Sequence, residues 1–196
     1  WSGGIMSGTG STTIPVGTAL TLDTTTQNLA LGARSFTNNN ASAVWSGNNN
    51  IQIGSGAVFT NAGTITVTGN GVLTNGVGGI GTFNNTGSFI KTTGTGTTTL
   101  TTNGPFDFNN SGTLDIQSGT LNVGSTSFNH NGLINLAAGR TLNLSAPGTG
   151  SGDYVLAAGA TVNLSAAQTL SAGADISGAG TFTVAGGTLS LPAATS

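Results

Sequence analysis

The chain has 196 residues and a formal net charge of −2, set by three Lys or Arg and five Asp or Glu side chains. Three isolated cations cannot neutralise a run of phosphates, and no window approaches 18 consecutive apolar residues, so composition argues against a nucleic-acid partner and against membrane insertion. A hydrophobic fraction of 36% with so little charge also argues against a disordered chain.

Residue preferences predict strands and turns rather than helices. Thr occurs 35 times, Gly 34 times and Asn 21 times, whereas Glu is absent. Thr, Val and Ile favour strands, Gly and Asn favour turns, and the good helix formers Glu, Lys and Gln are almost missing. The absence of Cys is compatible with an extracellular chain that uses no disulfides.

The first third of the chain already contains a repeat. Trp1-Ser-Gly3 recurs as Trp45-Ser-Gly47, an offset that equals two turns of about 22 residues each, and the segment GTALTL (17–22) reads as a strand. We therefore expect the repeat to start near residue 1, with less regular turns over residues 1–50. Because the chain opens at Trp1 without a signal peptide, we take it as a processed or excised segment.

From residue 59 onward one phrase recurs, in which a Phe is followed by Asn or Thr, a Gly and an alternating apolar run. Its copies are FTNAGTITV (59–67), FNNTGSF (83–89), FNNSGTLDI (108–116) and FNHNGLINL (128–136). The leading residues are Phe59, Phe83, Phe108 and Phe128, and Phe36 lies one period before the first of them. Their spacing of roughly 20–25 residues is typical of a solenoid, because one such unit cannot bury its apolar face alone and must stack on its neighbours.

Alternation assigns the faces of these strands. Leu114 and Ile116 are predicted to point inward and Asp115 outward, because residues i and i+2 of a strand share a face. By the same rule Asn135, which aligns with Asp115 one repeat later, points to solvent.

A second strand follows in each repeat, at positions 119–123, 140–144, 160–164 and 180–184. The spacing of about 20 residues matches one turn of a parallel β-helix, in which like residues stack about 4.8 Å apart on adjacent turns. An outward amide ladder is therefore predicted for Asn122, Asn143 and Asn163.

Two features depart from simple alternation. Glycines mark the predicted corners, where we expect positive φ angles that Gly adopts without steric cost. These corner positions are Gly63, Gly87, Gly112 and Gly132 before one strand, and Gly119, Gly139 and Gly159 before the next. In the Thr-rich stretch 91–102, Lys91 stands where the repeat requires an apolar residue, which predicts a widened loop.

The predicted fold is all-β: a single-stranded, right-handed parallel β-helix (β-solenoid) of roughly nine coils, each of about 20–25 residues. Residues 1–196 form one solenoid domain, most regular over 103–191 and less regular over 1–50 and around 91–102. Right-handedness follows from the strong preference of parallel crossover connections for that hand.

The phrases FNNSGTLDIQSGTLNV (108–123) and NHNGLINLAAGRTLNL (129–144) resemble the right-handed β-helical repeats of large bacterial surface proteins, including autotransporter passenger domains and filamentous-haemagglutinin-type adhesins. The resemblance covers residues 50–191 and is one of pattern. It implies a secreted or surface-anchored fibre segment and carries over no functional residue.

Phage tailspikes and pectate lyases share this architecture, so a glycan-cleaving site is the first enzymatic alternative. General acid and base chemistry on a glycan needs two carboxylates roughly 5–10 Å apart. The candidate pairs are Asp107 with Asp115, and Asp153 with Asp175, which are one repeat apart in sequence and can stack on neighbouring coils. No cluster of other charged residues accompanies them, so we expect solvated outward residues and turn formers, and no catalytic residue.

No cofactor or metal site is predicted. His130 is the only histidine and takes the place of Asn110 in the preceding repeat, which predicts a corner position. The string GGIGTF (78–83) is similar to the calcium-binding nonapeptide of toxin repeats, but Thr82 stands where that motif needs an Asp.

Threonines raise a third alternative, ice binding, because some ice-binding solenoids present Thr-x-Thr on every coil. Such units occur at Thr64, Thr66 and Thr68 and at Thr97, Thr99 and Thr101. The predicted register places Asp115 and Asn135 in line with Thr66, which breaks that ladder within three coils.

These observations predict a non-enzymatic, extracellular or cell-surface structural protein: a β-solenoid segment of a fibre, filament or adhesin stalk. Because neither terminus shows a cap, we expect self-association, head-to-tail or lateral, or contact with neighbouring repeats of a longer chain. The alternatives are a cell-surface glycan-binding or glycan-cleaving β-helix and, third, an ice-binding solenoid.

Overall fold

The structure is a computed structural model that describes residues 1–101 and 103–192, with the backbone alone at residue 101. Residue 102, at the end of the stretch predicted to be irregular, and residues 193–196 of the predicted domain lie outside the described residues. In the described residues all regular structure is strand, 26 strands in total, and no helix is present. The prediction of an all-β chain is confirmed.

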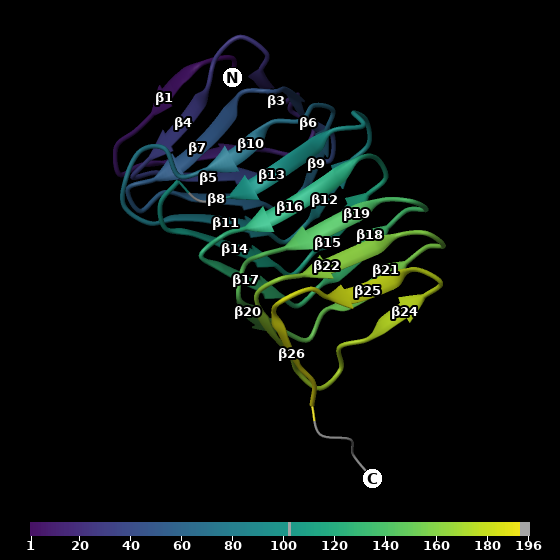
Figure 1. Ribbon diagram of the computed structural model, residues 1–196. Coiled ribbons are helices and arrows are strands. Elements are labelled where there is room, and N and C mark those ends of the chain that lie inside the picture. The colour runs from purple at the N-terminus through teal and green to yellow at the C-terminus, as the bar shows by residue number, and fades with distance from the viewer. Residues whose placement is uncertain (102, 193–196) are drawn as a thin grey trace.

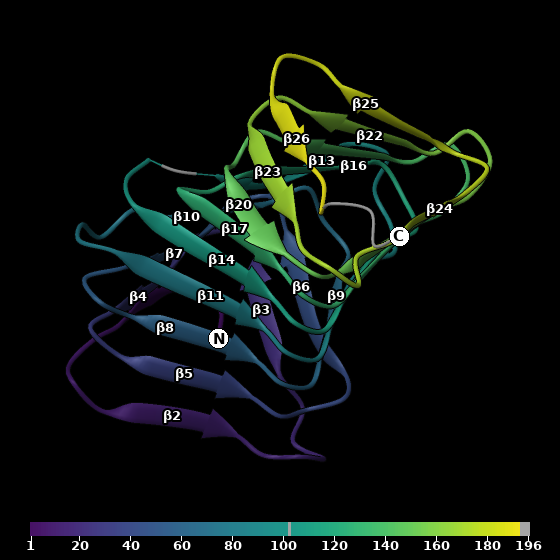
Figure 2. The same cartoon turned by 90° about the horizontal axis from the view of Figure 1, so that it is seen from below.

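The strands form parallel sheets that line the three sides of a coil (Figures 1 and 2). Sheet A contains β1 (Gly4–Met6), β4 (Leu29–Gly32), β7 (Asn50–Gly54), β10 (Val72–Thr74), β13 (Thr97–Thr101), β16 (Thr120–Gly124), β19 (Thr141–Leu144), β22 (Thr161–Leu164) and β25 (Thr181–Val184). Sheet B contains β2 (Ser11–Ile14), β5 (Ser35–Asn38), β8 (Val58–Asn61), β11 (Gly81–Asn85), β14 (Phe106–Asn110) and β17 (Ser127–His130). Sheet C contains β3 (Thr21–Thr24), β6 (Ala43–Gly47), β9 (Thr64–Val67), β12 (Ser88–Lys91), β15 (Thr113–Ile116), β18 (Leu133–Leu136), β21 (Asp153–Leu156) and β24 (Ile176–Gly178). Sheet D contains β20 (Gly148–Gly150), β23 (Ala167–Leu170) and β26 (Thr188–Ser190), and it follows sheet B along the same side.

Each strand stacks on the strand three places later, which makes the chain a β-solenoid. Eight turns of three strands are followed by β25 and β26, which begin a ninth. One turn separates Thr141 from its partner Thr161, Leu29 from its partner Ile51, and Val72 from its partner Thr99, so a turn takes 20 to 27 residues. Seen from the C-terminal end in Figure 2, the path from β24 through β25 to β26 runs counter-clockwise towards the viewer, so the coil is right-handed, as predicted.

Stacked inward side chains form the core. Phe36, Phe59, Phe83, Phe108 and Phe128 occupy one register position of sheet B and are all buried. Neighbouring rings in this column have centroids 5.0 to 5.4 Å apart, within the range of favourable aromatic pairs. Leu114 and Ile116 are buried while Asp115 faces outward, which confirms the alternation predicted from sequence.

The corner glycines divide into two groups. Gly119, Gly139 and Gly159 have φ angles of 56°, 71° and 74°, as predicted. The prediction of positive φ is wrong for the other group, Gly63, Gly87, Gly112 and Gly132, none of which lies in that region. Their requirement is close approach, because a Cβ placed on Gly112 would lie 2.0 Å from the carbonyl oxygen of Gly87 on the preceding turn.

Lys91 extends into the interior instead of forming part of a loop. It pairs in register with Val67 and Ile116, both buried, and its own side chain is 0% exposed. The loop that follows is wide, as predicted, since β12 ends at residue 91 and β13 begins at 97, whereas β15 ends at 116 and β16 begins at 120. Within this loop the Nζ of Lys91 donates to the carbonyl of Thr93, and it also donates to the carbonyl of Gly69 and to Oδ1 of Asn70 on the preceding turn.

Candidate functional site

The most extensive polar arrangement is a ladder of buried carboxamides inside sheet B. Asn38, Asn61, Asn85 and Asn110 are each at most 1% exposed. The Nδ2 of each residue donates to the Oδ1 of the next, over 2.8, 2.8 and 2.7 Å. The ladder ends at His130, whose Nδ1 lies 3.0 Å from the Nδ2 of Asn110.

Backbone carbonyls complete the hydrogen bonds of this inner ladder. The Nδ2 of Asn61 also donates to the carbonyl of Ser88 over 2.8 Å, and that of Asn85 donates to the carbonyl of Thr113 over 2.9 Å. Asn61 and Asn85 therefore each tie their own turn to the start of the next strand on the following turn. The ladder is a structural device, because every polar group that it buries has a partner inside the coil.

Sequence reasoning missed this ladder, although the signal was present. Each Asn lies two residues after a core Phe, as Asn85 does after Phe83, and period-2 alternation places both on the same face. The prediction that His130 occupies a corner is accordingly wrong: it lies in the interior, 1% exposed.

His130 is held as a neutral imidazole. Its ring stacks on Phe128 and meets Tyr154 edge-on, with centroids 5.8 and 5.0 Å away. Nδ1 accepts from Asn110, which assigns the proton to Nε2, and Nε2 donates to the carbonyl of Asp153 over 3.2 Å. Burial lowers the pKa of His130 below its usual value, which favours the neutral ring.

The two predicted carboxylate pairs lie in different surroundings. Asp107 lies on sheet B and accepts from Ser127 over 2.7 Å, whereas Asp115 lies on sheet C and accepts from Gln117 over 2.6 Å. Asp153 and Asp175 do lie on adjacent coils, but an oxygen of Asp153 accepts the backbone N–H of Asp175 over 3.0 Å. All of these hydrogen bonds are contacts of the kind that residues in turns and strands make.

No metal or calcium site emerges from the described residues. They contain no group of three or more His, Cys, Asp or Glu side chains that could hold a metal ion. In the string at 78–83, Gly78 and Gly79 have positive φ in the loop after β10, and Thr82 pairs with Val58 and Asp107 on sheet B.

The outer faces carry two further carboxamide ladders. On sheet A, Asn143 donates to Asn122 over 2.7 Å and Asn163 donates to Asn143 over 2.9 Å, in the positions predicted from sequence. On sheet B, the ladder comprises Asn84, Asn109 and Asn129, joined by two bonds of 2.9 Å.

The threonines form one broken and one continuous column. On sheet C, Thr66 is followed by Ile90 and then Asp115, so the column ends as the sequence predicted. On sheet A, an unbroken column runs through Thr97, Thr120, Thr141, Thr161 and Thr181. The predicted unit at 97–101 does not continue as Thr-x-Thr, because Thr99 is followed by Asn122, and the side chain of Thr101 lies outside the described residues.

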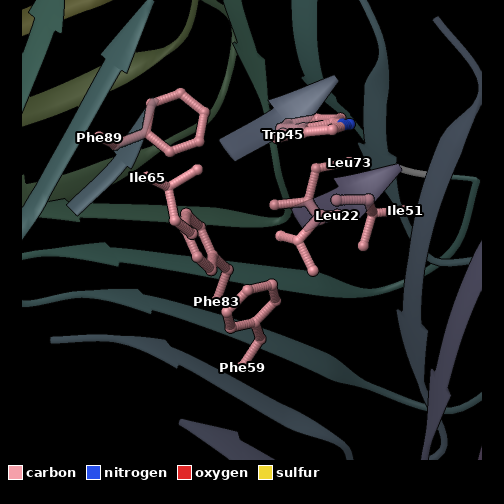
Figure 3. A pocket seen from close by; sticks show the side chains of 8 residues that line it. All are labelled: Leu22, Trp45, Ile51, Phe59, Ile65, Leu73, Phe83 and Phe89. Atoms are coloured by element: carbon pink, nitrogen blue, oxygen red, sulfur yellow. The ribbon is translucent and has the colours of Figure 1, made fainter. Parts of the chain in front are cut away.

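One small cavity lies within the core of the early turns (Figure 3). Its volume is about 10 Å³, and its lining is apolar. The lining residues are Leu22, Trp45, Ile51, Phe59, Ile65, Leu73, Phe83 and Phe89. A space of this size and polarity is a packing defect, since it holds at most one water-sized particle and offers no hydrogen-bond partner.

Among the described residues, no helix is long and apolar enough to cross a membrane. No family model, curated protein or solved structure matches the chain.

Proposed function

We propose that this chain is a non-enzymatic structural protein, a β-solenoid segment of an extracellular or cell-surface fibre, filament or adhesin stalk. The observation that carries the proposal is the stacking of each strand on the strand three places later, from β1 to β26. Such a chain is quasi-one-dimensional and can span distance with a continuous core.

Three ladders support a mechanical role. The phenylalanine column, the inner asparagine ladder and the sheet hydrogen bonds all run along the axis of the coil and join successive turns. Axial load is therefore shared among hydrogen bonds that act in parallel. A net charge of only −2 gives the side walls little electrostatic repulsion, which supports lateral association or contact with neighbouring repeats as the partner interaction.

Localisation and shape test the proposal together. Antibodies raised against the folded chain should label intact producing cells, external protease should remove the signal, and electron microscopy of the released protein should show rods of constant width. Labelling that appears only after cell lysis, together with compact particles, would contradict the proposal.

A panel of polysaccharides tests the enzymatic alternative. We expect no turnover by the intact chain, because its carboxylates are engaged in turn and strand contacts. Turnover that is abolished by Asp153→Ala or Asp175→Ala would replace the structural function with a glycan-cleaving one.

A further inference from the structure

The outer side of sheet A presents two adjacent polar columns on its later turns. Thr120, Thr141 and Thr161 form one column, and Asn122, Asn143 and Asn163 form the next, with all six side chains half-buried. We call these six residues the Thr/Asn face. Strands β16, β19 and β22, which carry it, lie side by side in Figure 1.

The Thr/Asn face is a two-dimensional lattice with fixed spacings. Adjacent turns of a sheet are about 4.8 Å apart, and residues i and i+2 of a parallel strand are about 6.6 Å apart. The asparagines are fixed by their 2.7 and 2.9 Å hydrogen bonds to one another, and threonine is stiff at χ1 because it is branched at Cβ. Each ladder carboxamide has two N–H donors, so it keeps a second donor for an outside partner.

Sheet A also differs from the other sheets in charge. None of its nine strands contains Asp, Lys, Arg or His, whereas sheet C carries Asp23, Asp115 and Asp153, and sheet B carries Asp107. Arg140 precedes β19, but its Nε donates back to the carbonyl of Ala138 over 3.1 Å. A neutral, rigid array of hydroxyl, methyl and amide groups is complementary to a partner that is itself neutral and periodic.

We propose that the Thr/Asn face binds the surface of ice. Ice is an uncharged lattice of hydrogen-bond donors and acceptors, and a pre-ordered lattice of matching groups contacts it without losing conformational entropy on binding. A soluble glycan fits less well, because the large exposed apolar residues in the described part of the chain include no aromatic ring on which a sugar could stack. This inference is independent of the fibre function.

Thr141→Tyr, in the centre of the Thr/Asn face, tests the proposal. The tyrosine ring would project from the face and hold the neighbouring Thr and Asn side chains away from a flat ice surface. Thr113→Tyr on β15 is the matched control: Thr113 is also half-buried, outward and in mid-solenoid, but it lies on sheet C. Thermal hysteresis and ice-crystal shaping are measured for the intact chain and both variants, with circular dichroism to verify the fold. We expect the intact chain and Thr113→Tyr to show thermal hysteresis and ice-crystal shaping, and Thr141→Tyr to show neither.

Absence of hysteresis and shaping in the folded intact chain would overturn the proposal, as would equal activity in the two folded variants. If Thr141→Tyr fails to fold, Asn143→Lys serves instead, since it places a charge on the same face. Incubation with insoluble cellulose and chitin is run in parallel, and binding there without ice activity assigns the face to a crystalline polysaccharide and overturns the assignment to ice. Antibody labelling of intact cells, which tests the fibre function, does not depend on whether the chain binds ice. A negative ice-binding result can therefore be told apart from a failure of the fibre function.

Discussion

At the scale of the residue, the turns of this solenoid approach so closely that a single methyl group does not fit at certain corners. A Cβ on Gly87 would lie 2.0 Å from the carbonyl oxygen of Gly63, which is backbone and cannot move aside. We expect Gly87→Ala to lower the free energy of unfolding by about 1–3 kcal/mol, the usual cost of overpacking. Gly32→Ala is the control, because its Cβ would meet only the Cδ1 of Ile5 at 3.8 Å. Equal stability of the two variants in chemical denaturation would show that the backbone relaxes.

The buried imidazole predicts a pH dependence. Burial lowers the pKa of His130 in the folded state below 6.5, so the unfolded chain binds more protons than the folded chain once the pH falls below 6.5. Stability is therefore expected to decrease as the pH falls from 6.5 and to level off below the folded pKa. His130→Asn, which replaces the ring with the residue of the preceding turns, should flatten this dependence. Denaturation midpoints between pH 4 and pH 7 that are parallel for both proteins would rule out His130 as the cause.

The buried amine of Lys91 also predicts that stability rises with pH, but in a more alkaline range than His130 does. The Nζ of Lys91 donates to Gly69 O and Asn70 Oδ1, both at 3.2 Å, and to Thr93 O at 3.4 Å, while burial lowers its pKa below 10.5. The unfolded chain then holds an extra proton between the two pKa values, so stability should rise as the pH increases from the folded pKa of Lys91 towards 10.5. Lys91→Met retains the apolar stem and should remove the rise. A rise that persists in this variant would have to come from another group.

At the scale of the element, β11 contributes one asparagine to each ladder of sheet B. Asn85 faces inward and belongs to the inner ladder, whereas its neighbour Asn84 faces outward and belongs to the outer ladder. Asn85→Ala deprives buried groups of Asn110 and Thr113 of partners, at about 1–3 kcal/mol for each group left unsatisfied. Asn84→Ala removes an outward carboxamide of the same strand, and its effect should stay within about 0.5 kcal/mol. The two variants differ only in the face from which the carboxamide is removed. Similar losses in thermal or chemical unfolding would mean that the inner ladder does not stabilise the coil.

Much of the element pattern was predictable because it follows from spacing alone. The Phe column and the alternation of Leu114, Asp115 and Ile116 need only a period of about 22 and a period of 2. The inner ladder was missed because an Asn in isolation is costly to bury, and its partners become visible only when the turns are stacked. The threonine column of sheet A was missed because Thr-x-Thr was sought within strands, whereas the column runs between them. The steric role of Gly87 was missed because the distance between turns cannot be read from one strand.

At the scale of the whole molecule, stability should vary along the axis. In a solenoid each turn contacts only its neighbours, so local unfolding depends on how well a turn is covered on both sides. Strands β15, β18 and β19 bury alternate side chains, whereas no side chain of β1, β2, β24, β25 or β26 is fully buried. Amide hydrogen exchange of the intact chain should therefore be slowest in the central turns and fastest in these strands of the two end turns.

The inner ladder sharpens this expectation, because it connects the turns from Asn38 to His130 and does not extend beyond Asp153. In Asn85→Ala, exchange should accelerate most in β8, β11 and β14, which contact the altered rung, and least in β22 and β23. Asn84→Ala should leave the protection profile unchanged. Uniform acceleration along the chain in Asn85→Ala would instead identify the solenoid as one cooperative unit, in which the ladder acts through global stability and not through coupling between neighbouring turns.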